Sequence, residues 1–409
     1  MAEQHGKALV PQIRFAGFTD PWEQRKLGDI TEILSGARVH KGEWRTEGVP
    51  FYRSSDVMAA FNNTDNERVF ISQELFKELS ARSGVPEQGD VMVTGGGSVG
   101  TPYIVPDNKP LYTKDADLIW IKHCADISPE FLYYFFVAPV FRSYIASISH
   151  VGTIAHYTIE QVKDTSVGLP TQMAEQKMVG VFFKQLDSLI TLHQRKYDKL
   201  CVLKKSMLDK MFPKGGSLYP EIRFAGFTDP WEQRKLGELF EEHSEKDRDD
   251  LPALTIIQGG GTVHRDESKR NLQFDRSSLS NYKVVDTGDF IVHLRSFEGG
   301  LEKATCYGLV SPAYHIFRGK NVDSDFYYLY FRSKRFIDVD LKPHVYGIRD
   351  GRSIDIEGMK TIFIPWTNLA EQRRIGGFFD RLDSLITLHQ RKLELLRNIK
   401  KSMLDKMFV

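Results

Sequence analysis

Two segments of this 409-residue chain occur twice, and this internal repeat restricts the possible folds more than any other feature. Residues 11–28 read PQIRFAGFTDPWEQRKLG, and residues 220–237 differ from them at one position. Residues 174–212 and 370–408 share the blocks AEQ, LDSLITLHQRK and KKSMLDKMF in the same order. This constant frame encloses two blocks of different sequence, residues 29–169 and residues 238–365.

The second repeated segment has the pattern of a long amphipathic helix. No glycine or proline occurs in residues 182–212 or 378–409, and both residue types weaken or break helices. Apolar residues recur three and four positions apart, in a heptad-like seam that a histidine and a lysine interrupt in each copy. The seam consists of Val179, Phe182, Leu186, Leu189, His193, Lys196, Leu200, Leu203 and Met207, and in the second copy of Phe378, Leu382, Leu385, His389, Lys392, Leu396, Ile399 and Met403.

A second apolar row beside the seam widens the apolar face of each helix. We expect the helices to pack on each other along the seam and to offer the second row to a partner protein. The second row consists of Phe183, Ile190, Tyr197, Phe379, Ile386 and Leu393.

Two like helices, each after an equivalent block, favour a pseudo-two-fold arrangement in which they pair antiparallel. At about 1.5 Å per residue, residues 182–212 span roughly 46 Å. Half-sites of dimeric DNA readers lie about 34–36 Å apart, so the helix pair has a suitable length for a molecular ruler. The alternative is that the helices simply join two domains or pair two copies of the chain.

Each divergent block has the pattern of a mixed α/β domain, with short strands and an aromatic-rich helix. The predicted strands are residues 90–94, 118–121, 289–293 and 313–317, and the predicted helices are residues 131–144 and 326–336. The expected fold is therefore α+β, with two mixed α/β domains separated by two long helices that form an antiparallel coiled coil. The predicted segments are 1–169 for the first motif and domain, 170–214 for the central helix, 215–364 for the repeated motif and second domain, and 365–409 for the C-terminal helix.

Polar and glycine-rich loops at matching places in the two blocks are candidates for DNA contact. The loop of residues 95–100, GGGSVG, lacks the Gly-Lys-Ser/Thr ending of a phosphate-binding loop, but its bare backbone can approach DNA closely. In the second block, Arg295 suits guanine and Glu298 suits cytosine. The candidates are Arg53, Ser54, Ser55, Gly96, Gly97, Ser98, His150, Thr153 and His156 in the first block, and Gln258, Arg295, Ser296, Glu298, Tyr346, Arg349 and Arg352 in the second. Each set also fits an ordinary solvated loop.

Several common sequence motifs of catalysis and metal binding are missing. No Pro-Pro dipeptide occurs, so the Asn/Asp-Pro-Pro-aromatic site of amine methylation is absent, and no glycine motif has the context for S-adenosylmethionine. The one Pro-Asp pair, Pro106-Asp107, is not followed by the acid-x-Lys of a common nuclease core, and no His-x-x-x-His pattern occurs. We therefore expect a chain that is not an enzyme and carries no metal or cofactor.

Composition and charge restrict the surroundings of the protein. No apolar run approaches the roughly 18 residues that a membrane-spanning helix needs, so we expect no membrane partner. Three widely spaced cysteines indicate reduced thiols in a cytoplasmic protein. The net charge of +1 does not by itself indicate nucleic-acid binding. Either the positive charge is concentrated locally, or a partner neutralises part of the DNA phosphates.

The order of motif, variable block and helix, followed by the same three again, resembles the specificity subunit of type I restriction–modification systems. The resemblance covers the whole chain. Its most specific features are the helix openings PTQMAEQ at residues 170–176 and PWTNLAEQ at residues 365–372. The LDSLI runs and the KKSMLDKMF endings are similar to those of Gram-positive members.

The resemblance implies that each block is a target-recognition domain that reads one half of a split sequence in double-stranded DNA, with the helices setting the spacer. It also implies two methylation subunits that dock on the frame and modify flipped-out adenine, and restriction subunits that translocate and cleave DNA. S-adenosylmethionine, ATP and magnesium would then belong to these partners. The alternatives are a non-catalytic scaffold that binds proteins only, and an autonomous methyltransferase or nuclease.

Overall fold

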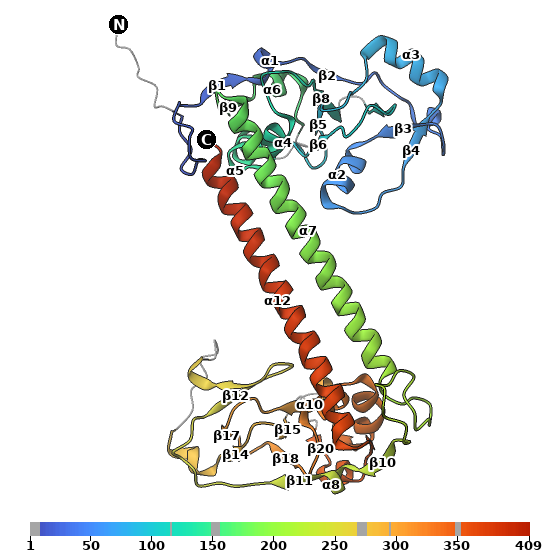
Figure 1. Cartoon of the computed structure of the whole chain (residues 1–409), viewed down its shortest axis with the longest axis vertical. Helices are drawn as coiled ribbons and strands as arrows, with labels where there is room; N and C mark the ends of the chain where they lie inside the picture. The colour runs from blue at the N-terminus through green and yellow to red at the C-terminus, as the bar shows by residue number, and fades with distance from the viewer. Residues whose placement is uncertain (1–8, 115–116, 149–155, 268–275, 294–295, 348–352) are drawn as a thin grey trace. The chain divides into compact units, whose positions relative to one another are not determined.

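The chain folds as two compact units, each containing one divergent block and one segment of each long helix (Figure 1). In this computed structural model, α7 (Met173–Lys210) has 38 residues and α12 (Leu369–Met407) has 39. The first unit consists of Met1–Gln194 with Arg391–Val409, and the second of Arg195–Gln390. The structure describes residues 9–114, 117–148, 156–267, 276–293, 296–347 and 353–409.

A four-stranded antiparallel sheet forms the centre of each unit, in the order β2-β8-β5-β6 in the first and β11-β18-β15-β16 in the second. The strands are β2 (Ile33–Ser35), β5 (Val91–Thr94), β6 (Pro102–Ile104), β8 (Leu118–Ile121), β11 (Phe240–His243), β15 (Phe290–Val292), β16 (Glu302–Lys303) and β18 (His315–Gly319). The four predicted strands are confirmed as β5, β8, β15 and β18. Each block therefore has its own central sheet, and the two sheets have the same architecture despite the different sequences.

The predicted aromatic helices are present but shorter than predicted. In the first unit the helix is divided into α4 (Pro129–Val137) and α5 (Pro139–Ile148), because proline has no N–H to continue the helical hydrogen bonds. In the second unit, α10 (Ser324–Phe331) ends before a π-helical turn, η4 (Phe336–Leu341). Their aromatic side chains fill the cores, and Phe131, Phe136, Phe326 and Phe331 are all buried.

Beyond the shared sheet, the two blocks differ. The first has a three-stranded sheet, β4-β3-β7, with helices α2 and α3, whereas the described part of the second has three separate two-stranded sheets, β12-β13, β14-β17 and β19-β20. The bounds are β3 (Val49–Tyr52), α2 (Ser54–Asn62), β4 (Val69–Ile71), α3 (Gln73–Ser83), β7 (Tyr112–Thr113), β12 (Leu254–Ile257), β13 (Gly261–His264), β14 (Lys283–Val285) and β17 (Gly308–Val310). The shorter elements are α1 (Leu27–Ile30), η1 (Lys41–Glu43), α6 (Ile159–Asp164), α8 (Leu236–Leu239), η2 (Arg265–Glu267), η3 (Arg276–Asn281), α9 (Ser296–Gly299), η5 (Lys342–His344), β19 (Val345–Tyr346), β20 (Ser353–Ile354) and α11 (Ile356–Lys360).

The first repeated motif closes each block by pairing with its last strand. The repeated letters EQRK form β1 (Glu23–Lys26) and β10 (Glu232–Lys235). They pair antiparallel with β9 (Ser166–Leu169) and β21 (Phe363–Trp366), respectively. Because these ladders join backbone groups, the same motif can pair with two different strand sequences.

A buried ion pair joins the two repeated motifs in each unit. The guanidinium of Arg14 donates two hydrogen bonds to Glu175, of 2.6 and 2.8 Å, and Trp22 donates a third of 3.3 Å. In the second unit, Arg223 donates to Glu371 at the same two distances, and Trp231 donates at 3.1 Å. These are bidentate, charge-assisted hydrogen bonds, the strongest class in proteins. The repeated arginine, tryptophan and glutamate thus form one hydrogen-bonded set that occurs once in each unit. We call this set the Arg–Glu lock.

The pKa of each arginine reflects this lock. The hydrogen bond to Glu175 raises the pKa of Arg14, and the hydrogen bond to Glu371 raises the pKa of Arg223 in the same way. The glutamate side chains are 1% and 0% exposed. A carboxylate buried to this extent requires a permanent cationic partner, and arginine supplies one at every physiological pH.

The glutamine that follows each glutamate connects the long helix to the block. Gln176 accepts a hydrogen bond of 2.9 Å from the backbone N–H of Ser128, the N-cap of α4. Gln372 accepts one of 2.8 Å from the N–H of Asp323, the N-cap of α10. In each unit, the glutamate therefore holds the repeated motif against the long helix, and the glutamine beside it holds the start of the aromatic helix.

The long helices begin several residues before their glycine-free runs, at Met173 and Leu369. Each helix therefore includes a glycine that lies where the helix passes close to its block. A Cβ atom on Gly180 would lie 2.5 Å from Cβ of Glu130 in α4. On Gly376, it would lie 2.6 Å from Oδ1 of Asp323 at the start of α10. Since neither distance is tolerated, α7 and α12 can approach the aromatic helices this closely only with glycine at these positions.

Within each unit, the α7 and α12 segments run antiparallel, as predicted. In the first unit, Lys400 of α12 donates to Asp187 of α7 at 2.6 Å, and Arg397 donates to Gln194 at 3.0 Å. Higher numbers on one helix thus face lower numbers on the other. In the second unit, Lys204 donates to Asp383 at 2.5 Å. These residues are the repeat counterparts of Lys400 and Asp187, which is the pairing expected of a pseudo-two-fold frame.

Replacing Arg14 with methionine should lower the free energy of unfolding of the first unit by about 3 kcal/mol, because Glu175 would remain charged and buried without its partner. The Arg14→Met/Glu175→Leu double variant should recover more than half of this loss. Urea denaturation followed by far-UV circular dichroism measures both effects.

Arg25→Met is the matched control, since Arg25 forms an exposed pair with Asp126 at 3.4 Å and should contribute less than about 1 kcal/mol. Equal losses in Arg14→Met and Arg25→Met would show that the buried lock contributes no more than a surface ion pair.

Candidate nucleic-acid interface

In the first unit, three of the predicted loops meet around Asp117, just before β8. The backbone oxygen of Asp117 accepts hydrogen bonds from Gly95 N at 2.8 Å and from the Ser54 hydroxyl at 3.0 Å. Its carboxylate pairs with Lys114, and a Cβ on Gly96 would lie 3.0 Å from it and 3.6 Å from the His156 ring. The structure therefore brings Ser54, Gly96 and His156 together, but Gly96 is a correction, because it is buried and only His156 of the three is exposed.

The glycine loop of residues 95–100 is held firmly at its base and open at its tip. Arg142 of α5 donates to the backbone oxygens of Val99 and Gly100 at 2.9 and 3.0 Å, and burial lowers the pKa of its guanidinium. At the tip, Gly97 and Ser98 are exposed. Gly97 has a φ of +71° with open space around the position of a Cβ, so only its backbone faces outward, where a nucleic acid can approach.

Residues 96–100 also read Gly-x-Ser-x-Gly, the letters of a hydrolase nucleophile elbow. That elbow is a strained turn from a strand into a helix. Here the loop connects β5 to β6, two antiparallel neighbours in the central sheet. The structural context of the motif therefore differs from that of a catalytic serine.

The neighbouring candidates at the start of α2 differ in their availability. Arg53 is engaged locally, because its Nε donates to Asp56 at 2.9 Å and its Nη2 donates to the backbone oxygen of Glu67 at 2.5 Å. Its side chain is 20% exposed. Ser55 is exposed and accepts from Asn66 at 3.2 Å. Ser55 therefore faces solvent, whereas Arg53 mainly stabilises its own loop.

In the second unit, two of the predicted loops come together. Gln258 lies in the turn between β12 and β13, directly against α9, and a Cβ on Gly299 would overlap its amide. Glu298 in α9 is exposed beside it. Ser296 is a correction, because its side chain is buried and its hydroxyl accepts from His293 N at 2.9 Å. It shapes the turn and is not accessible to DNA in this structure.

A buried glutamate that the sequence analysis did not single out organises this second set of loops. Glu302 is 0% exposed and accepts hydrogen bonds from Gly259 N at 2.6 Å and from the Tyr328 hydroxyl at 2.9 Å. It also pairs with Arg332 after α10. One carboxylate thus holds the β12–β13 turn, and with it Gln258, against the aromatic helix.

The remaining candidates lie elsewhere in the structure or outside the described residues. Tyr346 is exposed on the β19–β20 hairpin, and a hydrogen bond to Asp355 raises the pKa of its phenol. His150, Thr153, Arg295, Arg349 and Arg352 lie outside the described residues.

The predicted partner-facing row of the long helices is wrong for half of its members. Phe183, Phe379 and Leu393 are at most 4% exposed, and the first two pack in the cores of their units. Ile190, Tyr197 and Ile386 are half-buried. The first turns of each long helix lie against the core of its block, where Phe183 packs against Tyr134 of α4 with ring centroids 5.1 Å apart.

Leucines of the repeated LDSLITL run are exposed at equivalent positions on both helices, in addition to single exposed residues such as Val202 and Leu395. Leu189 and Leu192 are 44% and 47% exposed on α7, and Leu385 and Leu388 are 44% and 45% exposed on α12. We call these two pairs the leucine patches. Because each unit carries one patch of the same sequence, they are suited to bind two copies of one partner.

We also searched the described residues for metal sites and for membrane-spanning helices. Among the described residues, no group of three or more histidine, cysteine, aspartate or glutamate side chains is arranged to hold a metal ion. No single described helix is long and apolar enough to cross a membrane, although the bent pair α4 and α5 passes that test by length and composition.

Comparisons with known proteins agree with this architecture. Residues 19–201 match the family of type I restriction modification DNA specificity domains. The chain is 23% identical over 408 residues to the type I restriction enzyme MjaVIII specificity subunit of Methanocaldococcus jannaschii, covering 94% of this chain and 92% of the relative. It is 24% identical over 170 residues to a putative type I restriction enzyme specificity subunit of Haemophilus influenzae, a match that spans 41% of each chain.

A solved structure shows a similar fold. The crystal structure of the type I restriction–modification system S subunit from M. genitalium covers 98% of this chain and 99% of its own, with a TM-score of 0.52 and 13% identity. The chain therefore resembles the specificity subunits of type I restriction enzymes over 94% of its length, and residues 19–201 match the type I restriction modification DNA specificity domain.

Proposed function

We propose that each unit of this specificity subunit reads one part of a two-part DNA target, and that the paired helices set the spacer between the parts. The observation that carries this proposal is the twofold use of one frame under two different sets of loops. The Arg–Glu lock and the glutamine bond recur with distances equal to within 0.1 Å. The loops around Asp117 and Gln258 have no sequence in common.

We further propose that the chain itself is not catalytic and that two methylation subunits bind its leucine patches. Restriction subunits would then add translocation and cleavage. S-adenosylmethionine, ATP and magnesium would be used by these partners, and the complex would act on chromosomal DNA in the cytoplasm. Phosphate neutralisation shared with partners agrees with the net charge of +1.

Gel-shift titration of the chain with its methylation subunit should give a salt-sensitive complex with the target DNA, at least about a thousandfold tighter than with unrelated DNA. A target obtained from methylation mapping serves as the probe, and a scrambled duplex as the control. Equal affinity for both duplexes would favour the alternative of a scaffold that binds proteins only. Methyl transfer by the isolated chain would favour an autonomous enzyme.

Replacing Leu189 and Leu192 with glutamate should reduce the number of bound methylation subunits from two to one, because charge in an apolar interface is costly to desolvate. The matched Leu385→Glu/Leu388→Glu variant should do the same in the other unit, and the quadruple variant should bind none. Analytical ultracentrifugation measures the stoichiometry. Retention of two subunits by the quadruple variant would exclude the leucine patches as the docking site.

Inserting seven residues after Arg195 and seven after Arg391, its repeat counterpart, should lengthen the spacer by about three base pairs, since a heptad adds roughly 10 Å. The sequences read on either side should not change. Mapping of methylated adenines measures the spacing. An insertion after Arg195 alone should abolish methylation, because it breaks the antiparallel register, and an unchanged spacer in the matched double insertion would refute the ruler.

A further inference from the structure

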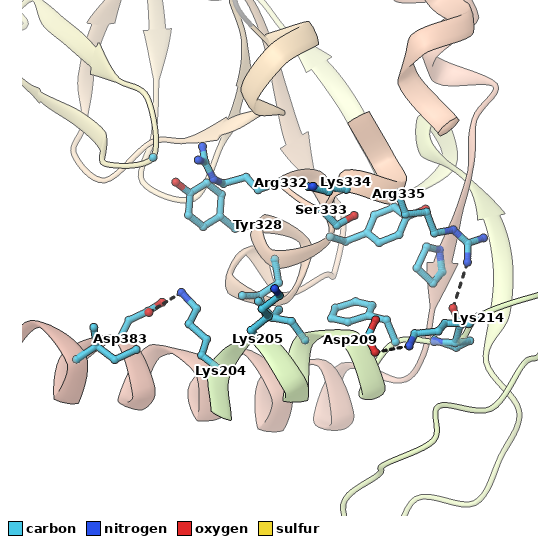
Figure 2. Close-up of a pocket in the computed structure, with 18 of the residues that line it drawn as sticks. Lys204, Lys205, Asp209, Lys214, Tyr328, Arg332, Ser333, Lys334, Arg335 and Asp383 are labelled. Atoms are coloured by element: carbon cyan, nitrogen blue, oxygen red, sulfur yellow. Dashed lines mark hydrogen bonds and ion pairs between the residues drawn. The ribbon is translucent and has the colours of Figure 1, made fainter. Parts of the chain in front are cut away.

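The second unit contains a basic groove between the end of α7 and the segment that follows α10 (Figure 2). We propose that this groove binds the sugar–phosphate backbone of the target DNA beside the half that the second unit reads, an inference that rests on the proposed function. Six cationic side chains line the groove: Lys204, Lys205, Lys214, Arg332, Lys334 and Arg335. The cavity has a volume of about 890 Å³.

The cations of the groove are only partly neutralised by the protein. The two carboxylates in its lining pair with Lys204 and Lys214, at 2.5 Å in each case. Lys205 and Lys334 are exposed and form no ion pair within the described part of the chain. Arg335 is 48% exposed, with its nearest carboxylate 4.0 Å away. Two unpaired lysines and one weakly paired arginine are therefore available to a ligand, in a chain whose net charge is only +1.

The position of these cations is fixed by the core beneath them. Arg335 donates to the backbone oxygen of Pro213 at 3.1 Å, which connects the two walls of the groove. The next residue, Phe336, is fully buried. The side chains of Lys334 and Arg335 therefore project from an anchored turn. A pre-arranged set of cations suits a ligand with regularly spaced negative charges, such as a phosphate backbone.

Comparison of the two units distinguishes DNA from a docking protein as the ligand. The N-caps Ser128 and Asp323 bond to equivalent glutamines. This equivalence aligns α4 with α10 and gives each cation after α10 a counterpart in the first unit. The counterparts of Arg332, Lys334 and Arg335 are Val137, Pro139 and Val140.

A surface that binds two copies of one partner would be repeated in both units. The α7 wall is repeated, since Lys204 and Lys205 recur as Lys400 and Lys401, but the wall after α10 is apolar in the first unit. The cationic wall therefore varies with the recognition block and not with the frame. This pattern favours DNA over the methylation subunits.

The groove also adjoins the candidate reading loop. Gly259, next to Gln258, forms part of its lining. Buried Glu302 accepts hydrogen bonds from both Gly259 and Arg332, so one carboxylate joins the reading turn to the groove. A DNA strand that contacts Gln258 would have phosphates within reach of this wall. Arg332 serves as a positioning residue, and the available cations are Lys205, Lys334 and Arg335.

The Lys205→Gln/Lys334→Gln/Arg335→Gln variant, in complex with methylation subunits, tests the proposal. We expect DNA affinity to fall at least about tenfold, equally for the target and for single-base variants of it, because phosphate contacts carry no sequence information. The slope of log Kd against log salt should decrease by about 2 to 3. Ethylation interference should lose its signal on phosphates beside one half of the target only.

The control removes three exposed cations elsewhere, in Lys246→Gln/Lys320→Gln/Lys401→Gln, and should leave the slope nearly unchanged. Thermal melting checks that both variants fold. If the wild-type complex binds the target and the triple variant retains the same slope and interference pattern, the groove proposal is refuted and the proposed function stands. Loss of methylation subunits from the triple variant would instead identify a protein ligand. Failure of the wild-type complex to bind the target would refute the proposed function itself.

Discussion

The buried pair between arginine and glutamate is the interaction on which the rest of this structure depends. In each unit, one carboxylate receives a bidentate guanidinium and an indole N–H. This arrangement fastens the short N-terminal motif to the start of a long helix that lies over a hundred residues away in sequence. Because the glutamate is buried, no solvated substitute is available. The arginine, the tryptophan and the glutamate must therefore be kept together, which explains why these three residues recur in both copies of the frame.

The same lock allows the enclosed blocks to diverge. The motif strand pairs with its block through backbone hydrogen bonds, and the repeated glutamine accepts a hydrogen bond from a backbone N–H at the start of the aromatic helix. Neither contact depends on the side chains of the block. Loops beyond the shared sheet can change without loss of the frame, so the first unit presents a glycine loop near Asp117 and the second presents the Gln258 turn. A basic groove after α10 is one consequence of this freedom.

The repeat, the α+β class, the strands and the antiparallel helices were predictable because each depends on local periodicity or on sequence identity. Which residues of the long helices are buried and which are exposed was less predictable. Phe183 and Phe379 are buried where a strict heptad predicts exposure, because the first turns of each long helix pack into the core of a block, a contact that the helix sequence alone does not reveal. Arg142 and Glu302 were missed for another reason. Each is a single polar residue without a sequence motif, and only the tertiary fold brings Arg142 to the glycine loop and Glu302 to the Gln258 turn.

The central claim is that two units read two parts of one target independently on a common frame. Exchange of residues 238–365 for the equivalent block of another specificity subunit, followed by sequencing of methylated adenines in the host DNA, tests it most directly. The account predicts a methylated sequence in which one specified part changes while the other part and the gap between them are retained. A change in both parts, or a continuous target without a gap, would contradict it.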